Sequence, residues 1–246
     1  MIEIRQLSKI FSKRPVLNEI TFTAGQGERV ALLGANGAGK TTLLRVLATY
    51  LPASSGFGKI AGFDLFSDSL SIRAITGYLP EGVPLYNDMR VAEYLKFRGR
   101  LRNMEGQLIR KRMHDVIAAC DLASWRLSRI GSLSAGLRHR VGLADAMLHE
   151  PRILLLDDPI ADCDPYQTEK ITSILADAEE GTQRTLIFTT HSSEIVLSIA
   201  TRIIFMERGQ IIADTHEVAS LKNKTLATMF GKWKKEFESS MEKSEK

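Results

Sequence analysis

The stretch GANGAGKTT, residues 34–42, decides the fold of this chain. It follows the apolar run Val30–Leu33 and precedes the helix-like pattern Leu43–Leu47. A strand, a glycine-rich loop and a helix in this order are typical of a phosphate-binding loop. The glycines let the backbone curl so that successive N–H groups point at phosphate oxygens, and the positive end of the following helix strengthens that field. The stretch therefore predicts a nucleotide-binding α/β fold.

Two side chains of this stretch have distinct expected roles. Lys40 is placed to reach the β- and γ-phosphates, and the Thr41 hydroxyl is placed to ligate Mg²⁺. The other residues of the expected ATP-binding loop are Gly34, Asn36, Gly37, Ala38, Gly39 and Thr42. A glycine turn with a chance Lys-Thr pair is the alternative, and the flanking strand and helix weigh against it. We therefore expect ATP and Mg²⁺ as cofactors.

Composition places the chain among ordinary globular proteins. Of its 246 residues, 44% are hydrophobic and 25% are charged, which suits one large domain or one domain with an inserted subdomain. No apolar stretch approaches the roughly 18–20 residues that span a bilayer, and the first residues lack the apolar core of a signal peptide. We therefore expect a cytoplasmic protein. Cys120 and Cys163 lack metal-ligand spacing and are expected to be reduced thiols.

The net charge of +4 is concentrated at the C-terminal end. The segment 222–246 carries seven Lys and four Glu, so it contributes +3 by itself. Global basicity is therefore weak evidence for nucleic-acid binding, and we expect no direct contact with nucleic acid.

Periodicity divides the chain into a strand-rich start, a helical middle and an α/β end. Strands are expected near residues 2–4, 17–23, 28–33, 59–61, 75–79, 153–156, 185–189, 202–206 and 210–213. Helices are expected at 41–49 and 165–180 and after His191, with a helical pattern from 91 to about 147. We therefore expect one domain over residues 1–221, with a helical subdomain inserted at about 86–147, and a basic tail over 222–246.

Three polar residues follow expected strands. Asp157 ends the apolar run 153–156 and is the expected Mg²⁺ partner, directly or through water. His191 follows a strand and can hydrogen-bond the γ-phosphate and position water. Glu81 also follows a strand and is expected to sense Mg²⁺ and the attacking water. Each residue alone is more often a turn, cap or surface residue, and the phosphate loop upstream favours the functional interpretation.

A second small-residue turn, LSAGL at residues 133–137, opens a helix. It offers the Ser134 hydroxyl and the Gly136 N–H as a second anion-binding helix N-terminus. Serine is a common helix cap, so the string is weak evidence by itself. Its end lies 16 residues before Ile153, and this position ahead of the acidic strand strengthens the interpretation.

Together these motifs resemble those of the ATP-binding cassette ATPases. GANGAGKT is similar to their Walker A motif, LSAGL to their signature motif, ILLLDDP to their Walker B motif, residues 161–164 to their D-loop, His191 to their switch histidine and Glu81 to their Q-loop position. The resemblance covers about residues 1–215. It places Phe11 where the family stacks an aromatic ring on adenine, although such a residue is as often part of a core. It implies a P-loop NTPase with a RecA-like parallel-sheet core, an N-terminal antiparallel β subdomain and an inserted helical subdomain.

The resemblance also implies ATP hydrolysis in a head-to-tail dimer. Each ATP would lie between one phosphate loop and Ser134, Ala135 and Gly136 of a second cassette subunit, identical or different, and would close the dimer. The run at residues 78–95 looks most like single-domain ATPase subunits of bacterial exporters. The helical insertion would dock an integral-membrane permease at the inner face of the cell membrane. The alternative is a soluble ATP-dependent switch with weak hydrolysis that acts on a protein or nucleic-acid complex.

The chain departs from the family pattern where bound ATP would react. Asp158 stands where the family usually carries the Glu that orients or activates water. Its reach is shorter by about 1.5 Å, and a misplacement of ~1 Å can cost on the order of 10²-fold in rate. Other departures are Glu81 for Gln, Ala135 and Leu137 for Gly and Gln, and Asp162-Cys163 for Gly-Leu, whereas Asp164 is kept. We therefore expect secure ATP binding and slow hydrolysis, with Asp158, His191 and Glu81 as catalytic residues.

Two basic regions each have two interpretations. The helical insertion carries Lys96, Arg98, Arg100, Arg102, Arg110, Lys111 and Arg112. A solvated helix face is the simpler interpretation, and a docking surface for the permease or for anionic lipid headgroups is the other. The tail around Phe230, Trp233 and Phe237 either packs on its own domain or forms an amphipathic membrane-surface segment.

Overall fold

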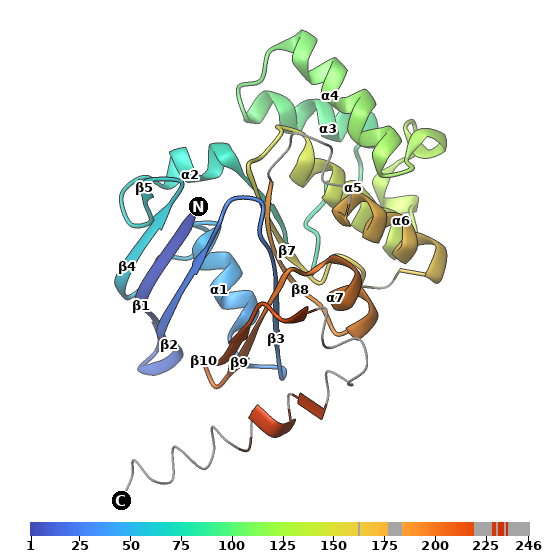
Figure 1. The fold of residues 1–246 in the computed structure, drawn as a ribbon. Coiled ribbons are helices and arrows are strands. Elements are labelled where there is room, and N and C mark those ends of the chain that lie inside the picture. Colours follow the sequence, from blue (N-terminus) through green and yellow to red (C-terminus); the bar gives the residue numbers. More distant parts are fainter. Residues whose placement is uncertain (162, 177–183, 219–227, 230, 234, 236–246) are drawn as a thin grey trace, which may run out of the picture.

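A computed structural model describes residues 1–161, 163–176, 184–218, 228–229, 231–233 and 235. These residues form a four-stranded sheet in the order β2-β1-β4-β5 and a six-stranded sheet in the order β10-β9-β3-β8-β7-β6 (Figure 1). The first sheet is antiparallel and contains β1 (Ile2–Phe11), β2 (Arg14–Ala24), β4 (Ser55–Ile60) and β5 (Phe63–Asp64). The second contains β3 (Arg29–Gly34), β6 (Thr76–Leu79), β7 (Ile153–Asp157), β8 (Thr185–Thr189), β9 (Arg202–Glu207) and β10 (Gln210–Thr215). It is parallel except for β10, which pairs antiparallel with β9.

The helices cover both faces of the six-stranded sheet. They are α1 (Lys40–Leu47), α2 (Ser69–Ile75), α3 (Val91–Leu101), α4 (Gly106–Ala119), α5 (Ala135–Met147), α6 (Pro165–Ala176) and α7 (Ser193–Ile199), with short 3-10 turns η1 (Ala123–Trp125) and η2 (Ile130–Ser132). Figure 1 shows α1 between the two sheets and α3 and α4 projecting away from them. This arrangement confirms the expected P-loop α/β fold.

Side-chain alternation on β7 divides the core in two. Ile153 and Leu155 point into a cluster with α1 and the antiparallel sheet, whereas Leu154 and Leu156 point into a cluster with α5, α6 and α7. Every residue of β7 is buried, as expected for a parallel strand that is covered on both faces. Residues 153–156 are therefore all packed in the core, and the next residue, Asp157, lies at the carboxyl end of the strand.

Helix α5 fastens the helical segment to the sheet. It packs against β6 and also touches α3 and α4. The contact requires Gly77, because a Cβ atom there would lie 2.1 Å from the Ala146 carbonyl oxygen. The packing of α5 on β6 thereby positions the segment Ser134–Gly136, at the start of α5, relative to the sheet.

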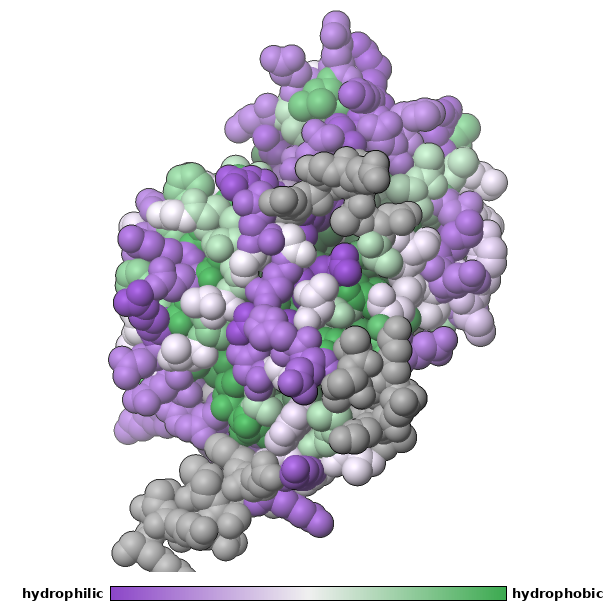
Figure 2. Space-filling view, in the orientation of Figure 1, coloured by the Kyte–Doolittle hydropathy of each residue, from purple (hydrophilic) through white to green (hydrophobic). Residues whose placement is uncertain are grey.

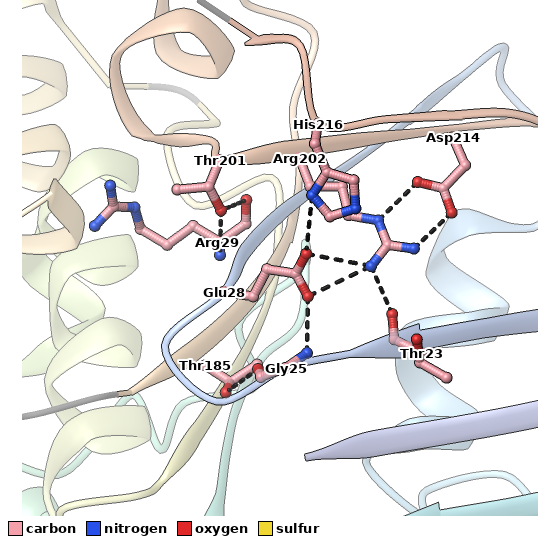
Figure 3. A network of polar contacts seen from close by, with 9 residues as sticks. All are labelled: Thr23, Gly25, Glu28, Arg29, Thr185, Thr201, Arg202, Asp214 and His216. Carbon is pink, nitrogen blue, oxygen red and sulfur yellow. Dashed lines mark hydrogen bonds and ion pairs between the residues drawn. The ribbon is translucent and has the colours of Figure 1, made fainter.

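A polar network joins the antiparallel sheet to the parallel one (Figure 3). The Arg202 guanidinium donates to both Asp214 carboxylate oxygens at 2.7 and 2.6 Å, and to the Thr23 carbonyl oxygen at 2.7 Å. It also pairs with Glu28 at 3.2 Å, and Glu28 in turn accepts from the Gly25 N–H at 2.7 Å. One buried guanidinium therefore links β2, β9, β10 and the turn before β3.

Several element boundaries differ from the sequence expectations. The expected helical pattern from 91 to 147 is broken into α3, α4, two 3-10 turns and α5, because the chain must reverse twice to stack these helices. Strands β1 and β2 are longer than expected, and bulges interrupt their pairing. Helix α2 was not expected, and Ile75, expected in a strand, ends it. Helix α6 is described as far as Ala176, so the expected end of that helix near 180 lies outside the described residues.

The structure places both cysteines and bears on the question of membrane spans. Cys120 is buried and Cys163 half-buried, and neither forms a disulfide. Within the described part of the chain, no helix combines the length and the apolar content needed to cross a bilayer.

The Trp233 ring lies 4.6 Å from the Phe205 ring, centroid to centroid, so this part of the tail packs on its own domain. Phe230 and Phe237 lie outside the described residues.

Candidate functional site

A cleft of about 360 Å³ lies at the carboxyl ends of the parallel strands. Loops after β3, β6, β7 and β8 meet there, at the edge where ligands bind in open parallel sheets. It is lined by Val16, Asn36, Gly37, Ala38, Gly39, Lys40, Thr41, Thr42, Glu81, Asp157, Asp158, Thr189 and His191. The tertiary structure thus gathers the expected metal partner, the catalytic residues and the phosphate loop into one site, except for Gly34, which does not line the cleft.

The phosphate loop is shaped by a glycine at the start of α1. Gly39 is the N-cap of this helix and has a φ of 103°, in the left-handed region that favours glycine. A Cβ atom at Gly39 would also lie 2.8 Å from the Val16 carbonyl oxygen. The turn therefore directs the first N–H groups of α1 into the cleft, where the helix dipole favours an anion.

Lys40 is held by the loop that it serves. Its ammonium donates to the carbonyl oxygens of Gly34 at 2.8 Å and Ala35 at 3.0 Å. Burial lowers the pKa of Lys40, an effect that Asp157 and Asp158 oppose. These bonds hold the ammonium at the loop and leave its third N–H free to donate to a phosphate group.

Asp157 fits the expected Mg²⁺ role. Its Oδ1 accepts a hydrogen bond from the Thr189 hydroxyl at 2.8 Å, whereas its Oδ2 is buried without a hydrogen-bond partner among the described residues. Thr41 lines the same cleft. Among the described residues no group of three His, Cys, Asp or Glu side chains is arranged to hold a metal, so the ion would rely on the expected Asp157, Thr41 and Glu81 and on the nucleotide. Bound Mg²⁺ would neutralise phosphate charge.

Asp158 has an unusual backbone. Its φ is 47°, in the left-handed region, and its N–H donates to the Thr189 hydroxyl at 2.9 Å. Burial raises the pKa of Asp158, and the neighbouring His191 opposes that rise. The side chain lines the cleft although it is shorter than the Glu of the resembling family. The backbone turn therefore contributes to aiming this carboxylate, which sequence reasoning could not foresee.

Glu81 and His191 complete the cleft from two different loops. Both are exposed and line it. Glu81 follows β6, and His191 lies between β8 and the N-terminus of α7, which is capped by the Ser192 hydroxyl. The expected catalytic residues are therefore adjacent in space, and their roles in hydrolysis stay predictions.

Some expected site residues do not line this cleft. The Phe11 ring is 42% exposed and lies under the Lys9 ammonium, 4.9 Å from its centroid. Ser134 caps α5, where its hydroxyl accepts from the Leu137 N–H at 3.3 Å. Ala135 has no positive φ, so it replaces glycine there without backbone strain. Adenine stacking by Phe11 and nucleotide contact by Ser134, Ala135 and Gly136 stay predictions.

The D-loop residues are only partly described. Asp164 caps α6, because its Oδ1 accepts from the Gln167 N–H at 2.8 Å. Asp162 lies outside the described residues. The expected role of Asp164 at a dimer interface stays a prediction, beside this helix-capping role.

Sequence reasoning missed two residues of the cleft, Val16 and Thr189. Val16 lies on β2, far from any motif. Thr189 is the last residue of β8 and the register partner of Asp157 on β7. The sequence signal for Thr189 was partial: the last residues of neighbouring parallel strands lie side by side, but the tertiary structure decides which strands are neighbours. A hydroxyl at that position can donate a hydrogen bond to the acid at the end of the neighbouring strand.

The basic stretch in the helical segment is not a single solvated face. Arg98 pairs with Asp145 at 2.9 Å, and Arg112 pairs with both Asp115 and Glu150 at 3.1 Å. Arg102 donates to the Arg73 carbonyl oxygen and contacts His149. The exposed members are Lys96, Arg100, Arg110 and Lys111. Three of the seven cations therefore serve internal contacts.

Comparison with known proteins points to the family that the sequence motifs resemble. The ABC transporter family model matches residues 17–161. The sulfate/thiosulfate import ATP-binding protein CysA of Methylococcus capsulatus is 36% identical over 216 residues, which cover 85% of this chain and 61% of CysA. The linearmycin resistance ATP-binding protein LnrL of Bacillus subtilis is 27% identical over 213 residues, covering 87% and 68%.

A solved structure has the same fold. It is the dimeric, post-hydrolysis state of the ATP-binding cassette MJ0796 bound to ADP and Pi. Its chain superposes with a TM-score of 0.81 at 22% identity, covering 88% of this chain and 98% of the other.

Proposed function

This chain belongs to the ABC transporter family and is an ATP-binding subunit with ATPase activity, and we propose that it powers an exporter by driving a separate membrane permease. ATP would close a dimer of cassette subunits, and hydrolysis would release it. The observation that carries this proposal is a second groove, which is connected to the ATP cleft by one short strand.

The second groove lies between α1, α2 and α3 and has a volume of about 450 Å³. Three large hydrophobic side chains line it and are unusually exposed: Leu70 at 79%, Tyr50 at 62% and Leu101 at 57%. In Figure 2 hydrophobic side chains gather at the α2 corner, beside the largely hydrophilic region of α3 and α4. Clustered exposed hydrophobic residues mark interaction sites, so this groove supports docking of a protein partner.

Strand β6 connects the groove to the cleft. Thr76 and Tyr78, on β6, line the groove, and Glu81, just beyond the end of β6, lines the ATP cleft. A displacement at the groove would be carried along this strand to the nucleotide and back. The geometry favours a subunit that couples ATP to a partner over an isolated ATPase.

The dimer is proposed from the place of the signature residues. Ser134 caps α5 and does not line the cleft of its own chain. It can therefore serve the ATP of a second subunit, as the resemblance implies. MJ0796 is described as a dimer. A mutant with the substitution Asp158→Asn is expected to dimerise on adding ATP, and Ser134→Arg is expected to prevent that while leaving ATP binding intact.

Export is the proposed direction of transport. The name of LnrL, a resistance protein, and the exporter-like run at 78–95 favour it, whereas the name of CysA describes import. Transport in vesicles that contain the chain and its permease decides the point. ATP-dependent movement of substrate away from the ATPase side supports export, and movement toward that side overturns it.

The permease contact is tested by affinity purification from detergent-solubilised membranes. The wild-type chain is expected to recover a multi-span membrane protein. Leu70→Glu together with Leu101→Glu should lose that protein but keep ATP binding. Leu127→Glu is the matched control, since Leu127 is 61% exposed and does not line the groove. Recovery of only non-membrane or nucleic-acid partners would favour the alternative, an ATP-dependent switch with weak hydrolysis.

A further inference from the structure

The end of β8 carries a buried hydroxyl that contacts two consecutive acidic residues of the cleft, Asp157 and Asp158. Thr189 is 3% exposed and is the parallel register partner of Asp157, so both side chains leave the sheet on the same face. The Thr189 hydroxyl donates to Asp157 Oδ1 at 2.8 Å and accepts from the Asp158 N–H at 2.9 Å. One atom thus contacts both residues.

The direction of these hydrogen bonds follows from their chemistry. An ionised carboxylate can only accept, so the single hydroxyl hydrogen of Thr189 must point to Asp157. A lone pair of the same oxygen is then left for the Asp158 N–H. Consecutive bonds of this kind polarise one another in a buried site. The chain from the Asp158 backbone to the Asp157 carboxylate therefore has one possible direction.

Each bond fixes a different feature of the site. The bond to Asp157 holds its carboxylate in one rotamer and leaves Oδ2 for a metal ion. The bond from Asp158 holds a backbone with a φ of 47°, which is unfavourable for most residues without external support. Without the hydroxyl, the Asp158 N–H and Asp157 Oδ1 would both lose their partner.

We propose that Thr189 is a positioning residue for ATP hydrolysis, which sets the Asp157 carboxylate and the Asp158 backbone through one hydroxyl. It touches neither phosphate nor water in this role. Its effect is therefore on the rate of hydrolysis and on the Mg²⁺ requirement, rather than on the binding of ATP itself.

The test compares two substitutions at Thr189, with a third substitution at Thr185 as the control. Thr189→Val removes the hydroxyl and keeps the shape, and is expected to lower kcat by about 10- to 100-fold and to raise the Mg²⁺ concentration for half-maximal rate. Thr189→Ser keeps the hydroxyl and is expected to stay within a few-fold of the wild type. The affinity for a fluorescent ATP analogue, measured with EDTA, is expected to change less than threefold in both.

Thr185→Val is the matched control. Thr185 lies at the other end of β8, is fully buried, and also holds two bonds, donating to the Gly25 carbonyl oxygen at 2.9 Å and accepting from the Gly27 N–H at 3.2 Å. Its loss is expected to lower thermal stability and to leave kcat and the Mg²⁺ requirement unchanged. If a general loss of stability in β8 caused the fall in kcat, Thr185→Val and Thr189→Val would show the same fall.

Three results would overturn the proposal. These are a Thr189→Val enzyme with kcat within twofold of the wild type, a Thr189→Ser enzyme as slow as Thr189→Val, or a Thr185→Val enzyme with the same fall in kcat. If Thr189→Val does not fold, Thr189→Ala removes the same hydroxyl and carries the same test. ATP affinity and the melting temperature show whether each variant is folded.

Discussion

The ammonium of Lys40 donates a hydrogen bond to the carbonyl oxygen of Gly34, six residues earlier, at 2.8 Å. The side chain that is expected to bind phosphate is thus hydrogen-bonded across the phosphate loop to the residue at its start. The charge is kept close to the place where the N–H groups of α1 point. A phosphate group would therefore meet a cation already in position, so little ordering of this side chain is needed on binding.

Lys40→Met is expected to weaken ATP binding by more than tenfold, because the substitution removes the cation but keeps most of the side-chain stem. The measurement is equilibrium binding of a fluorescent ATP analogue. Lys59→Met, on β4 and outside the cleft, is the control and should bind normally. Equal binding by Lys40→Met and the control would contradict the proposed role.

Asp158→Asn is expected to lower ATPase activity by on the order of 10²-fold or more and to leave ATP binding intact, because the neutral amide cannot take a proton from the attacking water as the ionised carboxylate can. Asp158→Glu is expected to raise the rate if the short side chain limits hydrolysis. The left-handed backbone at Asp158 is a physical reason why the longer side chain could fail to raise the rate. If Asp158→Glu is no faster, the backbone already compensates for the missing methylene.

The acid limb of the ATPase pH profile is a further test of Asp158. Burial raises the pKa of Asp158 above the ordinary value for an aspartate. Activity that needs the ionised form is complete above this raised pKa and is lost as the pH falls through it. The limb is therefore expected at a higher pH than for an ordinary aspartate. An acid limb at or below that ordinary value in a protein that is still folded would contradict the assignment.

Arg202→Met is expected to lower the free energy of unfolding by about 3 kcal/mol, because it leaves the Glu28 carboxylate buried without its cation. The comparison is Arg5→Met, whose ion pair with Glu3 is exposed and should contribute less than about 1 kcal/mol. Urea unfolding followed by tryptophan fluorescence measures both. A similar small change for the two variants would show that the network of Figure 3 is energetically a surface contact.

His149 is expected to make the fold sensitive to acid. Burial, and secondarily Arg102, lower its pKa to about 3, whereas an unfolded chain has a value of about 6.5. Between these values only the unfolded state binds the proton, so stability falls as the pH drops below about 6.5, by up to ~1.4 kcal/mol per pH unit. Above that pH the group contributes no pH dependence.

Melting temperatures of the wild type and His149→Gln between pH 7 and pH 5 test this expectation. The glutamine cannot take up a proton, so the variant should lose less stability than the wild type on acidification. Buried carboxylates contribute equally to both proteins and cancel in the comparison. Parallel pH profiles for the two would show that His149 does not carry the effect.

The parts of the fold that follow from local patterns were predictable. The strand before Gly34, the helix after Lys40 and the buried strand at 153–156 each follow from a short stretch of sequence. Helix α2 and the break-up of the helical pattern after Val91 were not predictable, because they depend on packing between distant segments. The bulged pairing of β1 likewise depends on its partners β2 and β4.

By itself, the sequence determined which chemical groups this protein has: a phosphate loop, a candidate metal-binding acid, a candidate base and a second helix N-terminus, each next to a recognisable turn. Only the tertiary structure decided how these groups meet. The parallel register of β7 and β8 places Thr189 beside Asp157, and the backbone at Asp158 turns left-handed there. The physical reason is that hydrogen bonds and backbone strain depend on ångström-scale distances between residues remote in sequence, which residue types and spacings do not encode.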